Sequence, residues 1–152
     1  MSQFQKPTPV LLVNSIPPCL PFWTERLGFP KVAEVPGSDG LPQFVILPGD
    51  GIEVVYPTWA AAAEDSPSAA AGARGHSIAL FLEVNNLDRI DAALAGIPRV
   101  AERHTTFYGM EELTVREPSG ALVTFAMKVA GCRFRRSGYW LDAQCCTLTA
   151  NG

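Results

Sequence analysis

The sequence lacks the long apolar run that a membrane-spanning helix requires. Its longest uninterrupted apolar stretches, such as residues 44–47 and 78–82, are far shorter than the roughly 20 residues that cross a bilayer. The first ten residues, MSQFQKPTPV, also lack the apolar core and small-residue cleavage site of a secretory signal. We therefore expect a cytoplasmic protein with no membrane partner.

Cysteine is scarce, and the cysteines that are present do not form the C-x-x-C pairs of structural zinc sites. Cys19 stands alone, whereas Cys132, Cys145 and Cys146 lie near the end of the chain. A cytoplasmic environment keeps such thiols reduced. We therefore expect neither a disulfide framework nor a structural zinc ion.

The chain also lacks an excess of basic residues, because its formal net charge is −3 and its pI is near 5.3. Proteins that bind DNA or RNA use clustered lysine and arginine, so we expect no nucleic-acid partner. The acidic balance mildly favours cationic ligands. No G-x-S-x-G elbow, Walker loop or H-E-x-x-H helix is present, which leaves no recognisable catalytic constellation.

What the sequence does contain is an internal repeat within a single domain of 152 residues, of which 47% are hydrophobic. Twice, a short apolar strand is followed by a helix cap, by apolar residues at helical spacing and by a glycine. The first copy consists of residues 9–13, Asn14, Ser15, Leu20, Trp23, Leu27 and Gly28. The second copy consists of residues 78–84, Asn85, Asn86, Leu87, Ile90, Leu94 and Gly96.

Three further strands are predicted after each helix, separated by turns rich in proline and glycine. They cover residues 31–35, 43–47 and 52–56 in the first half and 99–102, 110–116 and 122–128 in the second. Each half is therefore predicted to be a βαβββ module of an α+β protein. Residues 60–75, rich in Ala, Ser and Gly, predict a surface linker, although residues 60–65 could form a helical turn.

Three segments resemble a known family. Residues 22–29, FWTERLGF, resemble the first-helix segment of bleomycin-resistance proteins. Residues 108–112, YGMEE, are similar to that family's Trp-Gly-x-Glu segment, and residues 116–120, REPSG, are similar to its Arg-Asp-Pro-x-Gly turn. The resemblance covers residues 7–128 and points to the glyoxalase, bleomycin-resistance and extradiol dioxygenase (vicinal oxygen chelate) superfamily.

The resemblance implies modules at residues 7–59 and 76–128, joined by a linker at 60–75, whose sheets pair into a curved, half-open barrel. It also implies a homodimer in which the two chains exchange N-terminal strands. The segment from residue 129 to 152 departs from the family pattern, adding basic residues, Tyr139 and Trp140. This tail could be a disordered appendage, a short helix that covers an apolar patch, or a fused extension.

In the superfamily's enzymes, metal ligands stand on the first and fourth strands of each module. The resemblance places these positions at Thr8, Ala79 and Thr124, none of which is a competent ligand, and leaves Glu53 as the one suitable carboxylate. One carboxylate with water does not make a tight transition-metal site. We therefore expect no family-type metal centre and no other cofactor.

The two histidines need separate treatment, because histidine is a frequent metal ligand and a ready general base. His76 precedes its strand, and we expect it to make an ordinary hydrogen bond. His104 lies just before Phe107 and Tyr108 and could line the mouth of a cavity beside a carboxylate.

The expected ligand-binding residues are aromatic or acidic, because small-molecule sites combine apolar walls with a few fixed polar groups. Tyr108 aligns with the tryptophan that packs against the drug in bleomycin-resistance proteins, and so could offer a stacking face. Burial in the core is the competing interpretation for Phe44. The full predicted set is Tyr108, Phe107, His104, Trp59, Tyr56, Phe44, Glu53 and Glu111, with Glu112 as the alternative to Glu111.

The function predicted from these observations is non-catalytic binding of a small molecule such as a cationic or aromatic toxic compound or antibiotic. The alternative is an enzyme of the same superfamily. Such an enzyme would be a metal-dependent lyase or dioxygenase with relocated ligands, or a metal-free isomerase with Glu53 or His104 as its base. A scaffold protein whose cavity is filled by side chains is the third possibility.

Overall fold

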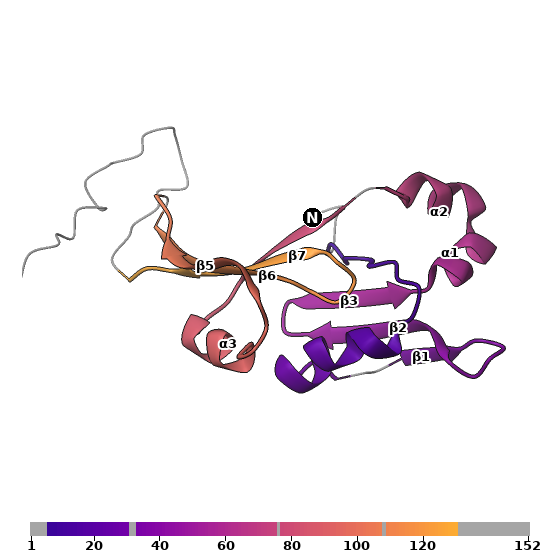
Figure 1. Ribbon diagram of the computed structural model, residues 1–152, viewed down its shortest axis with the longest axis horizontal. Coiled ribbons are helices and arrows are strands. Elements are labelled where there is room, and N and C mark those ends of the chain that lie inside the picture. Colours follow the sequence, from indigo (N-terminus) through magenta and orange to yellow (C-terminus); the bar gives the residue numbers. More distant parts are fainter. Residues whose placement is uncertain (1–5, 31–32, 76, 108, 131–152) are drawn as a thin grey trace, which may run out of the picture. The chain divides into compact units, whose positions relative to one another are not determined.

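The computed structural model describes residues 6–30, 33–75, 77–107 and 109–130 (Figure 1). The predictions made for His76, for Tyr108 and for the tail from residue 131 lie outside the described residues. The chain divides into two compact units. The first contains residues up to 78 together with Glu117–Ala121, and the second contains residues 79–116 and those from 122 onward.

The first unit is built on an antiparallel sheet in the order β1-β2-β3, formed by Ala33–Pro36, Pro42–Gly49 and Ile52–Pro57. Residues 9–13 run parallel to β3 through isolated bridges that join Val10 to Val55 and Val13 to Thr58. The β2–β3 turn places Gly51 at a φ of 75°, a left-handed conformation that glycine adopts without steric cost. This turn sets the register of the hairpin.

Two short helical segments, η1 (Pro17–Cys19) and the π-helical η2 (Phe22–Arg26), follow the first strand. Trp23 is completely buried and packs edge-on against the rings of Phe22 and Phe29. The core beneath them is supplied by alternate sheet residues, because successive side chains of a strand point to opposite faces. These fully buried residues are Val45, Leu47, Val54 and Tyr56.

The second unit has a four-stranded sheet in the order β4-β7-β6-β5. Its elements are β4 (Ala79–Glu83), α3 (Leu87–Ala93), β5 (Arg99–Thr105), β6 (Met110–Arg116) and β7 (Leu122–Lys128). Asn86 caps α3, because its side-chain oxygen accepts a hydrogen bond from the Arg89 amide at 2.9 Å. Leu87 and Leu94 are completely buried, as are Leu113 and Val115 of β6.

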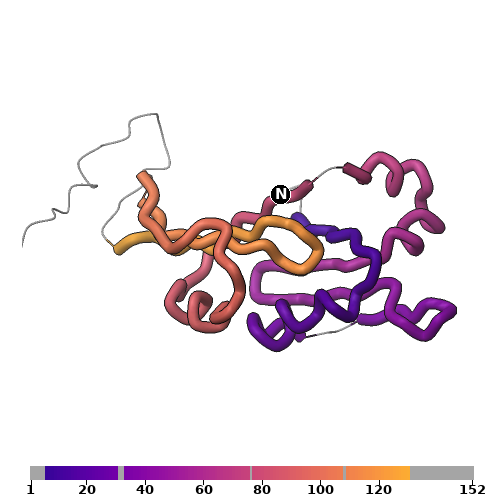
Figure 2. The backbone as a smooth tube through the Cα atoms, viewed as in Figure 1, coloured from indigo at the N-terminus to yellow at the C-terminus, as the bar shows by residue number. Residues whose placement is uncertain are grey.

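Both units follow the same path of strand, helix and three further strands, which can be traced twice along the colour gradient of Figure 2. In each unit the first strand runs parallel to the last one: residues 9–13 beside β3, and β4 beside β7. The prediction of an α+β protein made of two βαβββ modules is therefore confirmed.

The segment between the modules is helical, in line with the helical alternative given for residues 60–65, and the helical structure extends beyond that turn. It forms α1 (Trp59–Asp65) and α2 (Pro67–Ala73). Alanine is the strongest helix former, and the Thr58 side chain caps α1 by accepting a hydrogen bond from the Ala61 amide at 3.1 Å. The side chains are nevertheless largely exposed, apart from Ala70. Among the described residues, no helix is long and apolar enough to span a membrane.

Candidate functional site

The first sheet has one face covered by the helical segments and one that we call the open face. Residues directly opposite each other in a β ladder share a face. Between β2 and β3, the register pairs Phe44 with Pro57, Ile46 with Val55 and Pro48 with Glu53. On β1, Val35 is opposite Phe44, and in the first strand Val10 is opposite Val55. The open face therefore consists mainly of Val10, Val35, Phe44, Ile46, Pro48, Glu53 and Val55, of which Val55 is buried at 7% exposure. Val10 and Val35 are 47% and 46% exposed.

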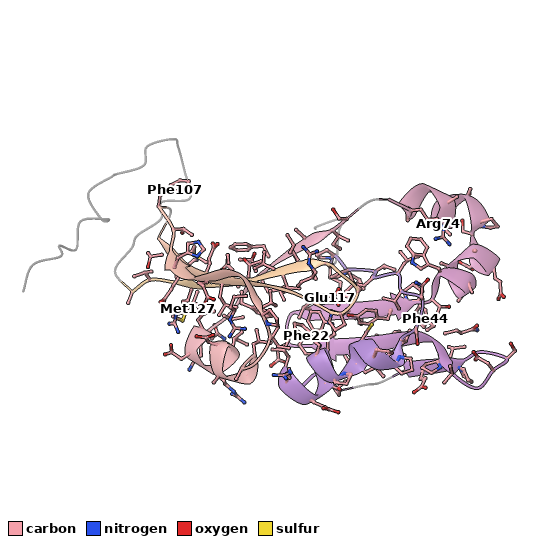
Figure 3. All side chains as sticks on the ribbon, in the orientation of Figure 1. Phe22, Phe44, Arg74, Phe107, Glu117 and Met127 are labelled. Carbon is pink, nitrogen blue, oxygen red and sulfur yellow. The ribbon has the colours of Figure 1, made fainter. Side chains whose placement is uncertain are left out.

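Glu53 brings negative charge to this apolar surface. Its Oε2 lies 3.1 Å from the ammonium group of Lys6, forming an ion pair between a side chain that is 26% exposed and one that is 60% exposed. Phe44 lies on the same face as Glu53 and is labelled in Figure 3. The structure thus brings together two of the residues that the sequence predicted to contact a ligand.

Tyr56, the third predicted residue on these strands, lies on the opposite face. It is three residues from Glu53 along β3, so its side chain points toward the helical segments, where it is completely buried. Its hydroxyl accepts a hydrogen bond from Trp23 Nε1 at 2.7 Å and donates one to Glu117 Oε2. A molecule bound on the open face would therefore not touch Tyr56.

Glu117 is a buried carboxylate that the sequence analysis assigned only to a turn. The turn segment Glu117–Ala121 belongs to the first unit. Glu117 is labelled in Figure 3. Its Oε1 accepts hydrogen bonds from the Ser119 hydroxyl and from the Ala121 amide. Neutral donors thus satisfy the buried charge, as hydrogen bonding must when a carboxylate leaves water. The alternation of Val54 and Tyr56 was the sequence signal for a buried tyrosine here.

The same region raises the pKa of two weak acids. Burial, and then the charge of Glu117, raise the pKa of the Cys19 thiol from 9.0 to about 11. Burial and the same carboxylate also raise the pKa of Tyr56 well above its ordinary value. Both groups are therefore protonated near neutral pH, which leaves Tyr56 free to donate its hydrogen bond to Glu117.

We expect the protein to lose stability in alkali through the Cys19 thiol. The folded state holds this proton more tightly than the unfolded chain does. The contribution is therefore fully present below pH 9 and is lost as the pH rises toward 11. Denaturant unfolding of the wild type and of Cys19→Ala between pH 8 and 11 measures it, and the variant should show the shallower decline. Parallel pH profiles for the two proteins would contradict the assignment.

The second sheet also has an open face, opposite the face that α3 covers. One row of this face crosses the sheet from Glu83 through Ala126 and Glu112 to His104. The next row contains Phe81, which is 51% exposed, and the two threonines at 114 and 124, whose hydroxyl oxygens are 2.8 Å apart. His104 Nδ1 lies 2.8 Å from the Glu102 carbonyl oxygen.

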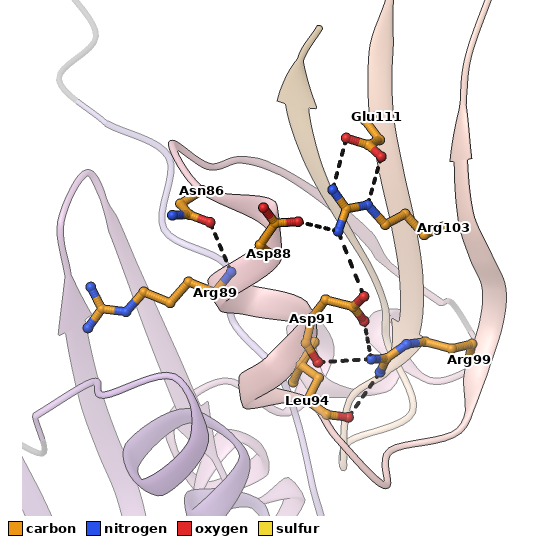
Figure 4. Close-up of polar contacts among 8 residues, drawn as sticks. All are labelled: Asn86, Asp88, Arg89, Asp91, Leu94, Arg99, Arg103 and Glu111. Carbon is orange, nitrogen blue, oxygen red and sulfur yellow. Dashed lines mark hydrogen bonds and ion pairs between the residues drawn. The ribbon is translucent and has the colours of Figure 1, made fainter.

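Glu111 points toward α3 rather than to this open face. Both of its carboxylate oxygens accept hydrogen bonds from Arg103, at 2.7 and 3.0 Å, and the same guanidinium contacts Asp88 at 2.6 Å (Figure 4). Glu112, paired with His104 in the register, is the carboxylate that shares the open face. Of the two alternatives left by the sequence, the structure thus places Glu112 beside the predicted histidine.

Two predicted aromatic residues lie outside the sheets. Trp59 begins α1, and the guanidinium of Arg74 stands 4.5 Å from the centre of its ring. Phe107 follows β5 at the hairpin tip and is 73% exposed. Tyr108, its neighbour in the sequence, lies outside the described residues.

The four positions that the resemblance marks as metal ligands alternate with the residues that face the helices. Glu53 lies on the open face of the first sheet, Thr8 alternates in step with Val10, and Ala79 and Thr124 belong to the open face of the second sheet. Three of them, however, offer a methyl group or a hydroxyl. Within the described ranges, no group of three or more His, Cys, Asp or Glu side chains could hold a metal ion. The residues present therefore do not fit a family-type metal centre.

Comparison with known proteins shows similarity of fold. No protein-family model and no curated protein matches the sequence. A glyoxalase/bleomycin resistance protein/dioxygenase from Nocardioides is 15% identical and has a TM-score of 0.69, with 91% of this chain and 92% of that chain covered. Lactoylglutathione lyase from Agrobacterium tumefaciens is 13% identical, with a TM-score of 0.64 and coverage of 84% and 95%. TioX from Micromonospora sp. ML1 is 16% identical, with a TM-score of 0.61 and coverage of 83% and 100%.

Proposed function

Because the chain has the fold of the glyoxalase/bleomycin resistance/dioxygenase proteins, we propose that it is a small-molecule binding protein that sequesters a cationic or aromatic toxic compound or antibiotic. The observation that carries this proposal is the open face of the first sheet. It combines exposed apolar side chains, an aromatic ring at Phe44 and a carboxylate at Glu53. Apolar walls with few polar groups are typical of small-molecule sites.

The proposal includes a homodimer in which the N-terminal segments exchange between chains. Residues 9–13 support it, because they lie at the edge of their sheet and join β3 through backbone hydrogen bonds that the same segment of another chain could make equally well. An edge strand presents backbone donors and acceptors to another chain. The molar mass in solution, measured by light scattering, tests for the dimer.

A metal-free isomerase is the second candidate, favoured by the position of His104 opposite Glu112 on the open face of the second sheet. An imidazole is a frequent general base, and a carboxylate on the same face could bind the group from which the proton is removed. A metal-dependent reaction is less well supported, because three of the four family ligand positions carry alanine or threonine. Binding without catalysis therefore remains the leading proposal.

Thermal unfolding in the presence of candidate ligands tests the function, together with the metal content of the purified protein. A molecule that binds only the folded state raises the apparent midpoint of unfolding by mass action. We expect bleomycin-type and other cationic aromatic compounds to raise it, with no stoichiometric divalent metal present. Stoichiometric metal, or an absence of stabilisation by any aromatic compound, would count against sequestration.

The resemblance aligns Tyr108 with the tryptophan that packs against the drug in bleomycin-resistance proteins, and on that basis we expect Tyr108→Ala to weaken ligand binding about tenfold, because a stacked aromatic contact contributes beyond the area that it buries. Isothermal titration of the ligand that stabilises best measures the change. Val100→Ala, which truncates an exposed side chain of β5, is the control and should bind normally. Circular dichroism should show that both variants remain folded, and unchanged affinity in a folded Tyr108→Ala protein would remove Tyr108 from the site.

A further inference from the structure

The Lys6–Glu53 ion pair shows how the open face of the first sheet accepts a cation. The lysine ammonium approaches Glu53 Oε2 at 3.1 Å from a segment that precedes the first strand. Lys6 is the more exposed partner. Glu53 belongs to β3, where its backbone is paired with that of Pro48 on β2. The carboxylate is therefore held in place, and the amine that meets it is carried on a flexible side chain.

The remainder of this face supplies an apolar floor beside the carboxylate. Residues two apart along a strand lie on the same face, separated by roughly 6.6 Å. Val55 is therefore next to Glu53 along β3, with Ile46 on one side of it and Val10 on the other. Phe44 lies one further step along, opposite Pro57. A flat ring attached to a cation would lie over this row of aliphatic side chains while its charge met Glu53.

We propose that Glu53 anchors the cationic group of an aromatic amine or amidine and that Lys6 is a resident counter-ion which the ligand displaces. This inference rests on the proposed function and adds the ligand class and the residue that selects it. An exposed ion pair contributes little to stability, so its loss opposes ligand binding only weakly. The amidine fits because it is planar and presents two donors to a carboxylate, as a guanidinium does.

The test uses benzamidine and its neutral analogue benzamide, which differ chiefly in charge. Chemical-shift titrations of the full-length protein measure both affinities and identify the amides that respond. We expect benzamidine to bind more tightly than benzamide and to shift the amides of Ile46, Glu53 and Val55. Glu53→Gln should weaken benzamidine about tenfold, the effect of losing a hydrogen bond to a charged group, and should leave benzamide unchanged.

Lys6→Gln separates displacement from simple binding. Removing the competing ammonium should strengthen benzamidine binding about twofold to fivefold, which is the range that exposed ion pairs allow. Glu64→Gln on α1 removes an exposed carboxylate from the same unit and is the matched control for Glu53→Gln, with no change in benzamidine affinity expected. Unchanged benzamidine affinity in Lys6→Gln would overturn the displacement.

An extended probe, 4-phenylbenzamidine, tests the direction in which the ligand lies. Its second ring should reach the row of Phe44, so Phe44→Ala should weaken this probe and leave benzamidine unchanged. Equal binding of benzamidine and benzamide on this face would overturn the role of Glu53 while leaving a binding protein in place. A face to which none of the three compounds binds, in a protein that no aromatic compound stabilises, would overturn the proposed function itself.

Discussion

Tyr56→Phe is expected to lower the free energy of unfolding by about 3 kcal/mol, because it removes the hydrogen bonds that the hydroxyl makes with two buried atoms, Trp23 Nε1 and Glu117 Oε2. The Tyr56 hydroxyl is the donor to Glu117 Oε2 and the acceptor for Trp23 Nε1. The ring itself is retained, so the change in packing is small. Urea unfolding followed by circular dichroism measures the loss.

A double-mutant cycle with Glu117→Leu shows whether the carboxylate is the reason. Replacing both members of a buried hydrogen bond costs less than the two single changes together, because no charge is then left stranded. We expect a coupling energy of about 1–3 kcal/mol between the two positions. Additive effects of Tyr56→Phe and Glu117→Leu would show that the hydrogen bond contributes nothing beyond packing.

Arg99→Met should lower the free energy of unfolding of the second unit by about 2–3 kcal/mol, since hydrogen bonds to charged groups are stronger than neutral ones. The Arg99 guanidinium, on β5, donates to the backbone oxygens of Asp91 and Leu94 and to the Asp91 carboxylate at 2.5 Å (Figure 4). It also donates to the backbone oxygen of Ile97. It therefore satisfies carbonyl groups that the end of α3 leaves without intrahelical partners. Hydrogen exchange of the α3 amides provides the local measurement.

Arg89→Met is the matched control for that change. Arg89 lies on α3, the helix that Arg99 contacts from β5, but its side chain is exposed and extends away from the cluster of carboxylates in Figure 4. A surface substitution of this kind usually changes stability by less than about 0.5 kcal/mol. Equal destabilisation by the two variants would mean that the loss of a positive charge near α3, and not the loss of the carbonyl contacts of Arg99, determines the effect.

Much of the fold could be predicted because local signals agreed with one another. Alternating apolar residues and turn glycines predicted the strands at residues 110–116 and 122–128 with the bounds that β6 and β7 have. Residues 60–75 gave a weaker signal, because low complexity suggested a linker whereas the helix propensity of alanine and the cap at Thr58 favoured helices. In that segment local propensity determined the secondary structure, even though most of its side chains remain exposed.

The sequence located candidate residues best where the alternation of side chains along a strand alone decides which face of the sheet a residue occupies. The resemblance pointed to Glu53 and Thr124, and the register puts both residues on the open faces of their sheets. Parity did not distinguish Glu111 from Glu112, because the choice depends on register shifts in β5 and on where Arg103 reaches. The contact between Lys6 and Glu53 joins residues 47 positions apart, which no local pattern reveals.

The parallel pairing of β4 with β7 has a consequence for the order in which the second unit can form. Hairpins such as β5–β6 and β6–β7 close over short loops, whereas β4 meets its neighbour only across more than thirty intervening residues. The antiparallel meander is therefore expected to assemble first, with β4 added last. During synthesis, β4 has to wait until residues 122–128 have left the ribosome, and until then its edge is available to other chains.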